Sequence, residues 1–185
     1  LRMRNNDISL GEYVENIIEN NPKEDEKLGK LYNYGAKYPE IKESAFLYDT
    51  AEITGDVIVG KNSVIASGVK IIGNSHGPIK IGNNVKILEN TVLHLLPDNE
   101  LIIEDDVIIG PGCIIHGTTI GSNSIIESGA IVCDYSKLGK NTLVKSGTLI
   151  KQRSVFDDNE ILEGFPAKSI GKNKELLKRP AWSDL

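Results

Sequence analysis

Two of the three histidines in this 185-residue chain follow a large aliphatic residue in the same way. His94 comes directly after Leu93, and His116 comes directly after Ile115. An imidazole nitrogen can bind zinc or iron, and it can also serve as a general base near neutral pH. If the fold places these two side chains on one face, the pair predicts a metal site or a proton-transfer site.

A six-residue repeat determines where the two histidines lie. From residue 41 to residue 150 an aliphatic residue returns at every sixth position, with ten-residue steps after residues 71 and 93 and a five-residue step after residue 115. This period is neither the 3.6 of a helix nor the 2 of a plain strand, so it predicts a short strand and a turn, repeated. The aliphatic positions are Ile41, Leu47, Ile53, Val59, Ile65, Ile71, Ile81, Ile87, Leu93, Ile103, Ile109, Ile115, Ile120, Ile126, Val132, Leu138, Val144 and Ile150.

Repeats of this kind predict an all-β solenoid in which three parallel strands make one coil. The aliphatic side chains point inward and stack on their equivalents in the next coil, about 4.8 Å away. Gly and Asn fill the turns because both tolerate positive φ. We expect this solenoid to cover residues 41–151. Residues 1–40 are expected to form an N-terminal helical cap, and residues 152–185 a C-terminal cap with a short helix over 172–178.

The residues directly after the aliphatic residues of the first wall point outward in one column. They are Thr54, Ile72, His94, His116, Cys133 and Lys151. His94 and His116 lie on adjacent coils, so both imidazoles can reach one metal ion, and the Cys133 thiolate is a possible further ligand. His76 lies in the first inserted loop, at the same corner. In the plainer interpretation the two histidines stack at an interface without a metal, Cys133 is a small apolar side chain and His76 is a solvated loop residue.

Composition limits the kinds of partner. The net charge is −5 and no basic stripe is present, which argues against nucleic acid. Apolar runs reach about four residues, whereas a membrane span needs roughly 20. Cys113 and Cys133 do not suggest a disulfide framework, and no signal-peptide pattern is found. The sequence therefore predicts a cytoplasmic protein that does not bind membranes.

Residues 41–170 resemble the γ-class carbonic anhydrases, a family within the hexapeptide-repeat superfamily. The segments that carry the resemblance are 77–82 (GPIKIG), 92–94 (VLH), 109–117 (IGPGCIIHG) and 164–168 (GFPAK). The resemblance implies a left-handed β-helix, a homotrimer, and a zinc or iron ion that three histidines hold between subunits. His94 and His116 match the two ligands that one subunit contributes. The position of the third ligand falls on Pro111, which cannot bind a metal.

Other polar positions of that family are also changed here. The Arg of an Arg-Gly-Asp segment falls on Ile72 and its Asp on Asn74, while a Gln-Asp pair falls on Leu88 and Glu89. Catalytic zinc needs about three protein ligands, and the groups around them tune affinity and activity by about 10 to 100-fold. The sequence therefore predicts a γ-carbonic anhydrase-like trimer with a degenerate metal site and without ordinary carbon dioxide hydration.

Two other functions fit the same sequence. A hexapeptide acyltransferase would bind acyl-CoA between subunits and use His76 or His116 as general base towards an acceptor hydroxyl or amine. The segment 164–168 is equally common in such enzymes. A structural trimer with no small-molecule ligand would explain the loss of the third histidine and of the surrounding polar groups.

Overall fold

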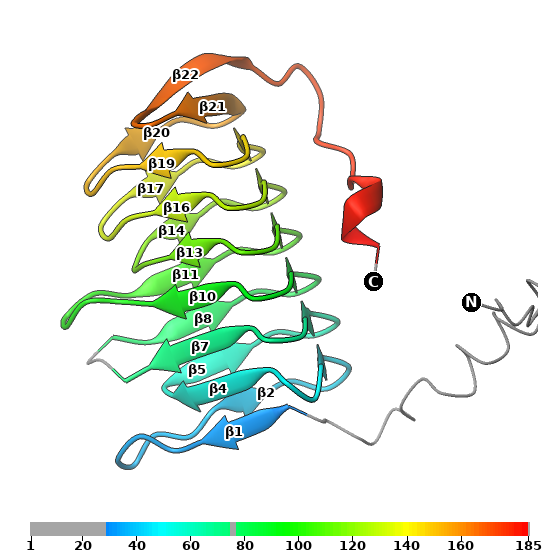
Figure 1. Cartoon of the computed structure of the whole chain (residues 1–185), viewed down its shortest axis with the longest axis vertical. Coiled ribbons are helices and arrows are strands. Elements are labelled where there is room, and N and C mark those ends of the chain that lie inside the picture. The colour runs from blue at the N-terminus through cyan, green and yellow to red at the C-terminus, as the bar shows by residue number, and fades with distance from the viewer. Residues whose placement is uncertain (1–28, 75–76, 185) are drawn as a thin grey trace, which may run out of the picture.

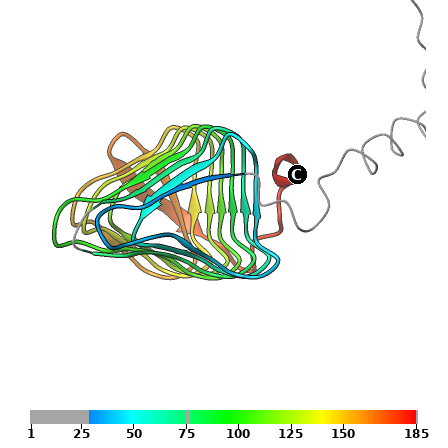
Figure 2. The same ribbon diagram turned by 90° about the horizontal axis from the view of Figure 1, so that it is seen from below.

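The computed structural model describes residues 29–74 and 77–184, which form a left-handed parallel β-solenoid of triangular cross-section. Its strands stack coil upon coil in Figure 1, and Figure 2 looks along the stack. The first wall is a seven-stranded parallel sheet made of β1 (Lys30–Tyr32), β4 (Glu52–Gly55), β7 (Lys70–Gly73), β10 (Val92–His94), β13 (Ile114–Ile115), β16 (Ile131–Val132) and β19 (Leu149–Ile150).

The other two walls follow the same order. The second wall contains β2 (Glu40–Ile41), β5 (Val57–Val59), β8 (Ile79–Ile81), β11 (Leu101–Ile103), β14 (Thr119–Ile120), β17 (Lys137–Leu138) and β20 (Val155–Phe156). The third contains β3 (Phe46–Leu47), β6 (Val64–Ile65), β9 (Lys86–Ile87), β12 (Ile108–Ile109), β15 (Ile125–Ile126), β18 (Leu143–Val144), β21 (Glu160–Gly164) and the antiparallel edge strand β22 (Ala167–Lys172).

The core confirms the predicted assignment of aliphatic residues to walls. In the first wall the inward residues pair in register from coil to coil and are essentially inaccessible to solvent. They are Ile53, Ile71, Leu93, Ile115, Val132 and Ile150. Because each strand of this wall is only two to four residues long, one coil alone buries little, and stacking on the next coil supplies the core.

Glycine is required at one corner because successive coils approach closely there. A Cβ atom on Gly121 would lie 2.6 Å from the backbone of Gly139 and of Lys140. We expect Gly121→Ala to lower the free energy of unfolding by about 3 kcal/mol, since this packed backbone has little room to move. Gly112→Ala is the matched control. It meets no atom within 4 Å but has φ +68°, so it should cost only about 1 kcal/mol.

Urea unfolding of the two glycine variants measures this difference. A loss for Gly121→Ala no larger than that for Gly112→Ala would show that the two coils can move apart enough to accept a Cβ atom at this corner.

The ends of the solenoid differ from the prediction. Residues 29–38 were expected to be helical, but Leu31 lies in β1 and pairs with Ile53, because this pairing packs Leu31 against the core. The solenoid also extends beyond residue 151, through β20 and β21. The rest of the N-terminal helical prediction lies outside the described residues.

The short helix predicted over 172–178 is not formed. This segment runs along the third wall instead, where the Asn141 side chain donates to Glu175 O and accepts from Leu177 N. These contacts replace helical hydrogen bonds, and the segment ends in the 3-10 helix η1 (Ala181–Ser183) (Figure 2). Within 29–74 and 77–184, no helix has the length and apolar character that crossing a membrane requires.

Candidate functional site

The structure brings His94 and His116 together on the outer face of the first wall. His94 ends β10 and His116 directly follows β13 on the next coil. The ring centroids are 6.0 Å apart and the ring planes are nearly perpendicular, at 83°. Both side chains are half-buried in the isolated chain. The repeat alone predicted this column, and the structure confirms the placement of the two imidazoles next to each other.

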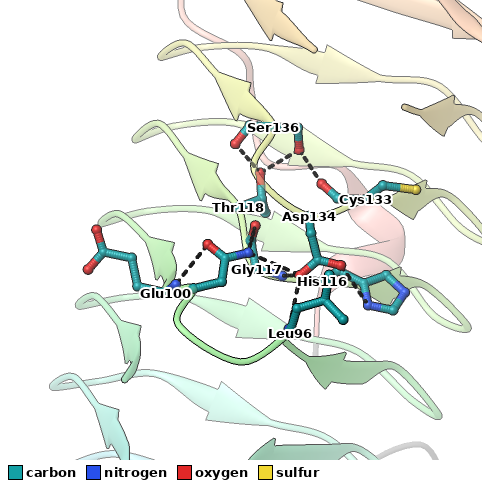
Figure 3. A network of polar contacts seen from close by, with 9 residues as sticks. Leu96, Glu100, His116, Gly117, Thr118, Cys133, Asp134 and Ser136 are labelled. Carbon is teal, nitrogen blue, oxygen red and sulfur yellow. Dashed lines mark hydrogen bonds and ion pairs between the residues drawn. The ribbon is translucent and has the colours of Figure 1, made fainter. Parts of the chain in front are cut away.

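A buried carboxylate lies beside His116, and no sequence pattern had singled it out. Asp134 Oδ2 is 3.5 Å from His116 Nδ1, and its side chain is only 9% exposed. Asp134 Oδ1 accepts hydrogen bonds from the backbone N–H of Leu96 and of Gly117, each at 3.1 Å, and from Asn99 Nδ2 at 3.0 Å (Figure 3). Three donors thus fix one carboxylate oxygen and leave the other facing the imidazole.

This arrangement orients the His116 ring. Nδ1 is buried and makes no hydrogen bond within normal limits, and Asp134 Oδ2 is the acceptor that it faces. A proton on Nδ1 would be stabilised by that carboxylate, which leaves the lone pair on Nε2, at the far edge of the ring. Distances of about 3.5 Å are common before substrate tightens a catalytic pair. The geometry therefore gives His116 the orientation of a general base.

The second inserted loop, residues 95–100, holds this carboxylate in place. Asn99 Nδ2 donates to Gly117 O at 2.8 Å as well as to Asp134, so one amide links the loop to the next two coils. The corner above is tied by Thr118 and Ser136, whose side chains bond each other, while Ser136 Oγ donates to Cys133 O at 2.6 Å (Figure 3). Insertion of this loop therefore builds the support for His116.

Both cysteines lie in environments that raise the pKa of the thiol. Cys133 lies one coil above His116, where burial and, secondarily, the negative charge of Asp134 raise the pKa of its thiol. Cys113 is fully buried at an inward position, and burial raises the pKa of its thiol to about 11. Without a metal ion, both environments favour the neutral thiol.

Other predicted site residues lie elsewhere in the described chain. Pro111 and Glu89 lie at the corner between the third and first walls, at the opposite end of the first wall from the histidines. Asn74 is exposed just after β7. His76 lies outside the described residues. The structure thus unites His94 and His116 and separates Pro111 and Glu89 from them within one chain.

The donors that one chain contributes from its described residues fall short of a catalytic zinc site. Across residues 29–74 and 77–184, no three His, Cys, Asp or Glu side chains converge closely enough to hold a metal ion. Pro111, the position that matches the third histidine of the resembled family, offers no donor. A carboxylate behind a histidine suits a metal ligand, but the two imidazoles fall short of the usual three protein ligands.

The fold and this wall of stacked short strands define a hexapeptide-repeat protein. Residues 101–134 match the family model described as bacterial transferase hexapeptide (six repeats). The chain is 41% identical over 140 residues to a carbonic anhydrase of Geobacillus kaustophilus. The aligned residues make up 76% of each protein. The chain belongs to the γ-class carbonic anhydrase-like family of hexapeptide-repeat proteins.

Further relatives connect the same fold to two named activities. Gamma carbonic anhydrase 2 of Arabidopsis thaliana is 29% identical over 148 residues, which is 77% of this chain and 53% of that protein. The crystal structure of a hexapeptide transferase family protein from Anaplasma phagocytophilum superposes with a TM-score of 0.74 at 31% identity, covering 79% of this chain and 86% of that one. The names of these relatives thus include both carbonic anhydrase and transferase.

Proposed function

We propose that this chain forms a homotrimer whose inter-subunit clefts carry out acyl-CoA-dependent acyl transfer, with His116 as the general base. The observation that carries the proposal is the buried Asp134 carboxylate beside His116 Nδ1, at 3.5 Å. A histidine held in this way is the arrangement that activates an acceptor hydroxyl or amine in acyl transfer.

The γ-class carbonic anhydrases surround their metal site with polar groups, and replacement of these groups here supports acyl transfer over carbon dioxide hydration. Pro111 occupies the third ligand position, and Ile72, Asn74 and Leu88 occupy positions that are polar or charged in the resembled family. Leu88 is buried. A metal ion would thus lack one ligand and the groups that orient its bound water, whereas His116 keeps everything that a general base requires.

An apolar ladder on the first wall supports the trimer. Val92, Ile114, Ile131 and Leu149 pair in register on four successive coils and point outward. Ile114 is 40% exposed in the single chain. A continuous exposed apolar row of this kind marks a protein interface. Because the two histidines lie at the edge of this ladder, packing of a second subunit would place them in a cleft between subunits.

The proposed reaction transfers an acyl group from sulfur to oxygen or nitrogen. The acceptor hydroxyl or amine attacks the thioester carbonyl carbon while His116 Nε2 takes its proton. The carbon–sulfur bond then breaks, and the proton passes from His116 to the CoA thiolate. His94, edge-on to His116, lines the same cleft and is placed to contact the acceptor or the acyl group.

Three measurements on the protein purified without chelator test the proposal: its mass by light scattering, its zinc and iron content, and its thermal unfolding with and without acetyl-CoA. We expect a trimer that holds much less than one metal ion per subunit. We also expect acetyl-CoA at about 100 times its Kd to stabilise the protein by about 2.7 kcal/mol.

Other outcomes would favour other functions. One zinc or iron ion per subunit, lost in His94→Ala, would instead support a metal site at His94 and His116, with or without Cys133, and would make carbon dioxide hydration the next assay. A metal-free trimer that acetyl-CoA does not stabilise would support a structural role.

A further inference from the structure

Two bulky residues adopt a backbone conformation that this solenoid otherwise reserves for small polar residues and glycine. Tyr135 has φ 60° and Arg153 has φ 63°. The other non-glycine residues of the described chain with positive φ are Ser44, Asn62, Asn84, Asn90, Asp98, Asp106, Asn123, Asn141 and Asn159. A tyrosine or arginine is less stable in this region than Asn or Gly. Such exceptions concentrate at functional sites, so the two side chains call for an explanation.

The two exceptions stack on each other directly above the His116 site. Tyr135 N donates to Gly117 O at 2.6 Å, and Arg153 N donates to Asp134 O at 3.1 Å. Tyr135 therefore lies at the corner one coil above His116, and Arg153 lies on the next coil. The Arg153 guanidinium carbon is 4.8 Å from the centroid of the Tyr135 ring. The ring supports the guanidinium, which fixes its position without a salt bridge.

The charge of Arg153 has no carboxylate partner among the residues that the structure describes. Its side chain is exposed, and its ring contact with Tyr135 leaves the guanidinium edge free to donate hydrogen bonds. Lys151, in the outward column two coils above His116, is also exposed and has no ion pair in the described chain. Two unpaired cationic side chains of the described chain thus lie at the corner above the site.

We propose that Tyr135 and Arg153 form an anion-binding subsite, which selects substrates that carry a carboxylate or phosphate group for the reaction at His116. A guanidinium held over a ring can still present two parallel N–H donors, which match the two oxygens of either group. Lys151 adds positive charge beside this subsite. The role of the Tyr135–Arg153 subsite in selecting a substrate rests on the proposed acyl transfer. The binding of anions at this subsite does not.

Binding measurements on the trimer test the subsite directly. Inorganic phosphate, acetate and acetyl-CoA are titrated separately at ionic strength matched with sodium chloride, by calorimetry or by chemical-shift changes when binding is weak. In Arg153→Gln we expect affinity for at least one of these probes to fall about 10-fold. Lys174→Gln, which removes one exposed charge on the C-terminal segment, is the matched control and should leave affinity unchanged.

The probe that loses affinity identifies the source of the anion. A loss confined to acetyl-CoA assigns the subsite to the acyl donor, and a loss for phosphate or acetate assigns it to the acceptor. Unchanged affinity for all three probes in Arg153→Gln would overturn the proposal. These outcomes do not depend on turnover, so they remain distinct from a failure of His116 to act as base.

Thermal stability provides a second readout that a structural role would not produce. In the double variant Tyr135→Asn, Arg153→Asn, both positions receive a residue that tolerates positive φ. We expect its Tm to equal or exceed that of the native protein while anion affinity falls. A clear decrease in Tm with unchanged affinity would show that the pair serves only to hold the two coils together.

Discussion

The His116→Asn variant is expected to transfer acyl groups from acetyl-CoA about 10²- to 10⁴-fold more slowly than the native protein, with little change in acetyl-CoA affinity. General-base catalysis typically contributes this much, and asparagine cannot accept the proton of the acceptor. The rate is measured as release of the CoA thiol, with the amine or hydroxyl acceptor that gives the fastest native reaction.

His94→Asn is the matched control for this experiment. His94 lies 6.0 Å from His116 between ring centroids, but it has no carboxylate behind it among the described residues. We therefore expect a smaller loss, which falls mainly on the KM for the acceptor. If His94→Asn were the more damaging change, the base would be the other imidazole, and the role assigned to Asp134 would be wrong.

The Asp134→Asn variant is expected to keep the fold and lose most of the activity. The amide oxygen can still accept from Leu96 N, Gly117 N and Asn99 Nδ2, so the loop of residues 95–100 stays attached. The amide N–H groups would then face His116 Nδ1 and favour the tautomer that carries its proton on Nε2. That tautomer cannot act as base, and we expect kcat to fall about 10²- to 10⁴-fold.

Asp134→Ala separates orientation from stability. It removes the acceptor of one buried and two part-buried N–H groups, and we expect the free energy of unfolding to fall by about 2–4 kcal/mol. Urea unfolding measures the stability of both variants, and nitrogen-15 NMR of the imidazole reports its tautomer. An active Asp134→Asn protein with an unchanged tautomer would show that the carboxylate supports the loop without orienting His116.

The sequence determined the fold of the central coils because every coil buries its inward aliphatic residues in the same way. An inward aliphatic residue at each sixth position can be buried only by stacking, so the period alone assigned Leu93 and Ile115 to neighbouring strands of one wall. The outward column containing His94 and His116 followed directly. Short-range patterns were less reliable at the ends. Leu31 fits a helical spacing, but pairing with Ile53 against the core decides its conformation.

Only the tertiary structure identified the groups that give His116 a chemical role. Asp134 is one acidic residue among 26 in the sequence, and its position in a turn resembles that of an ordinary solvated aspartate. Its burial, its three donors and its distance from His116 depend on how an inserted loop folds back over the next two coils. The repeat thus encodes which residues share a wall. The side-chain packing at the corners decides which of them act together, because those contacts join coils at separations that no six-residue period specifies.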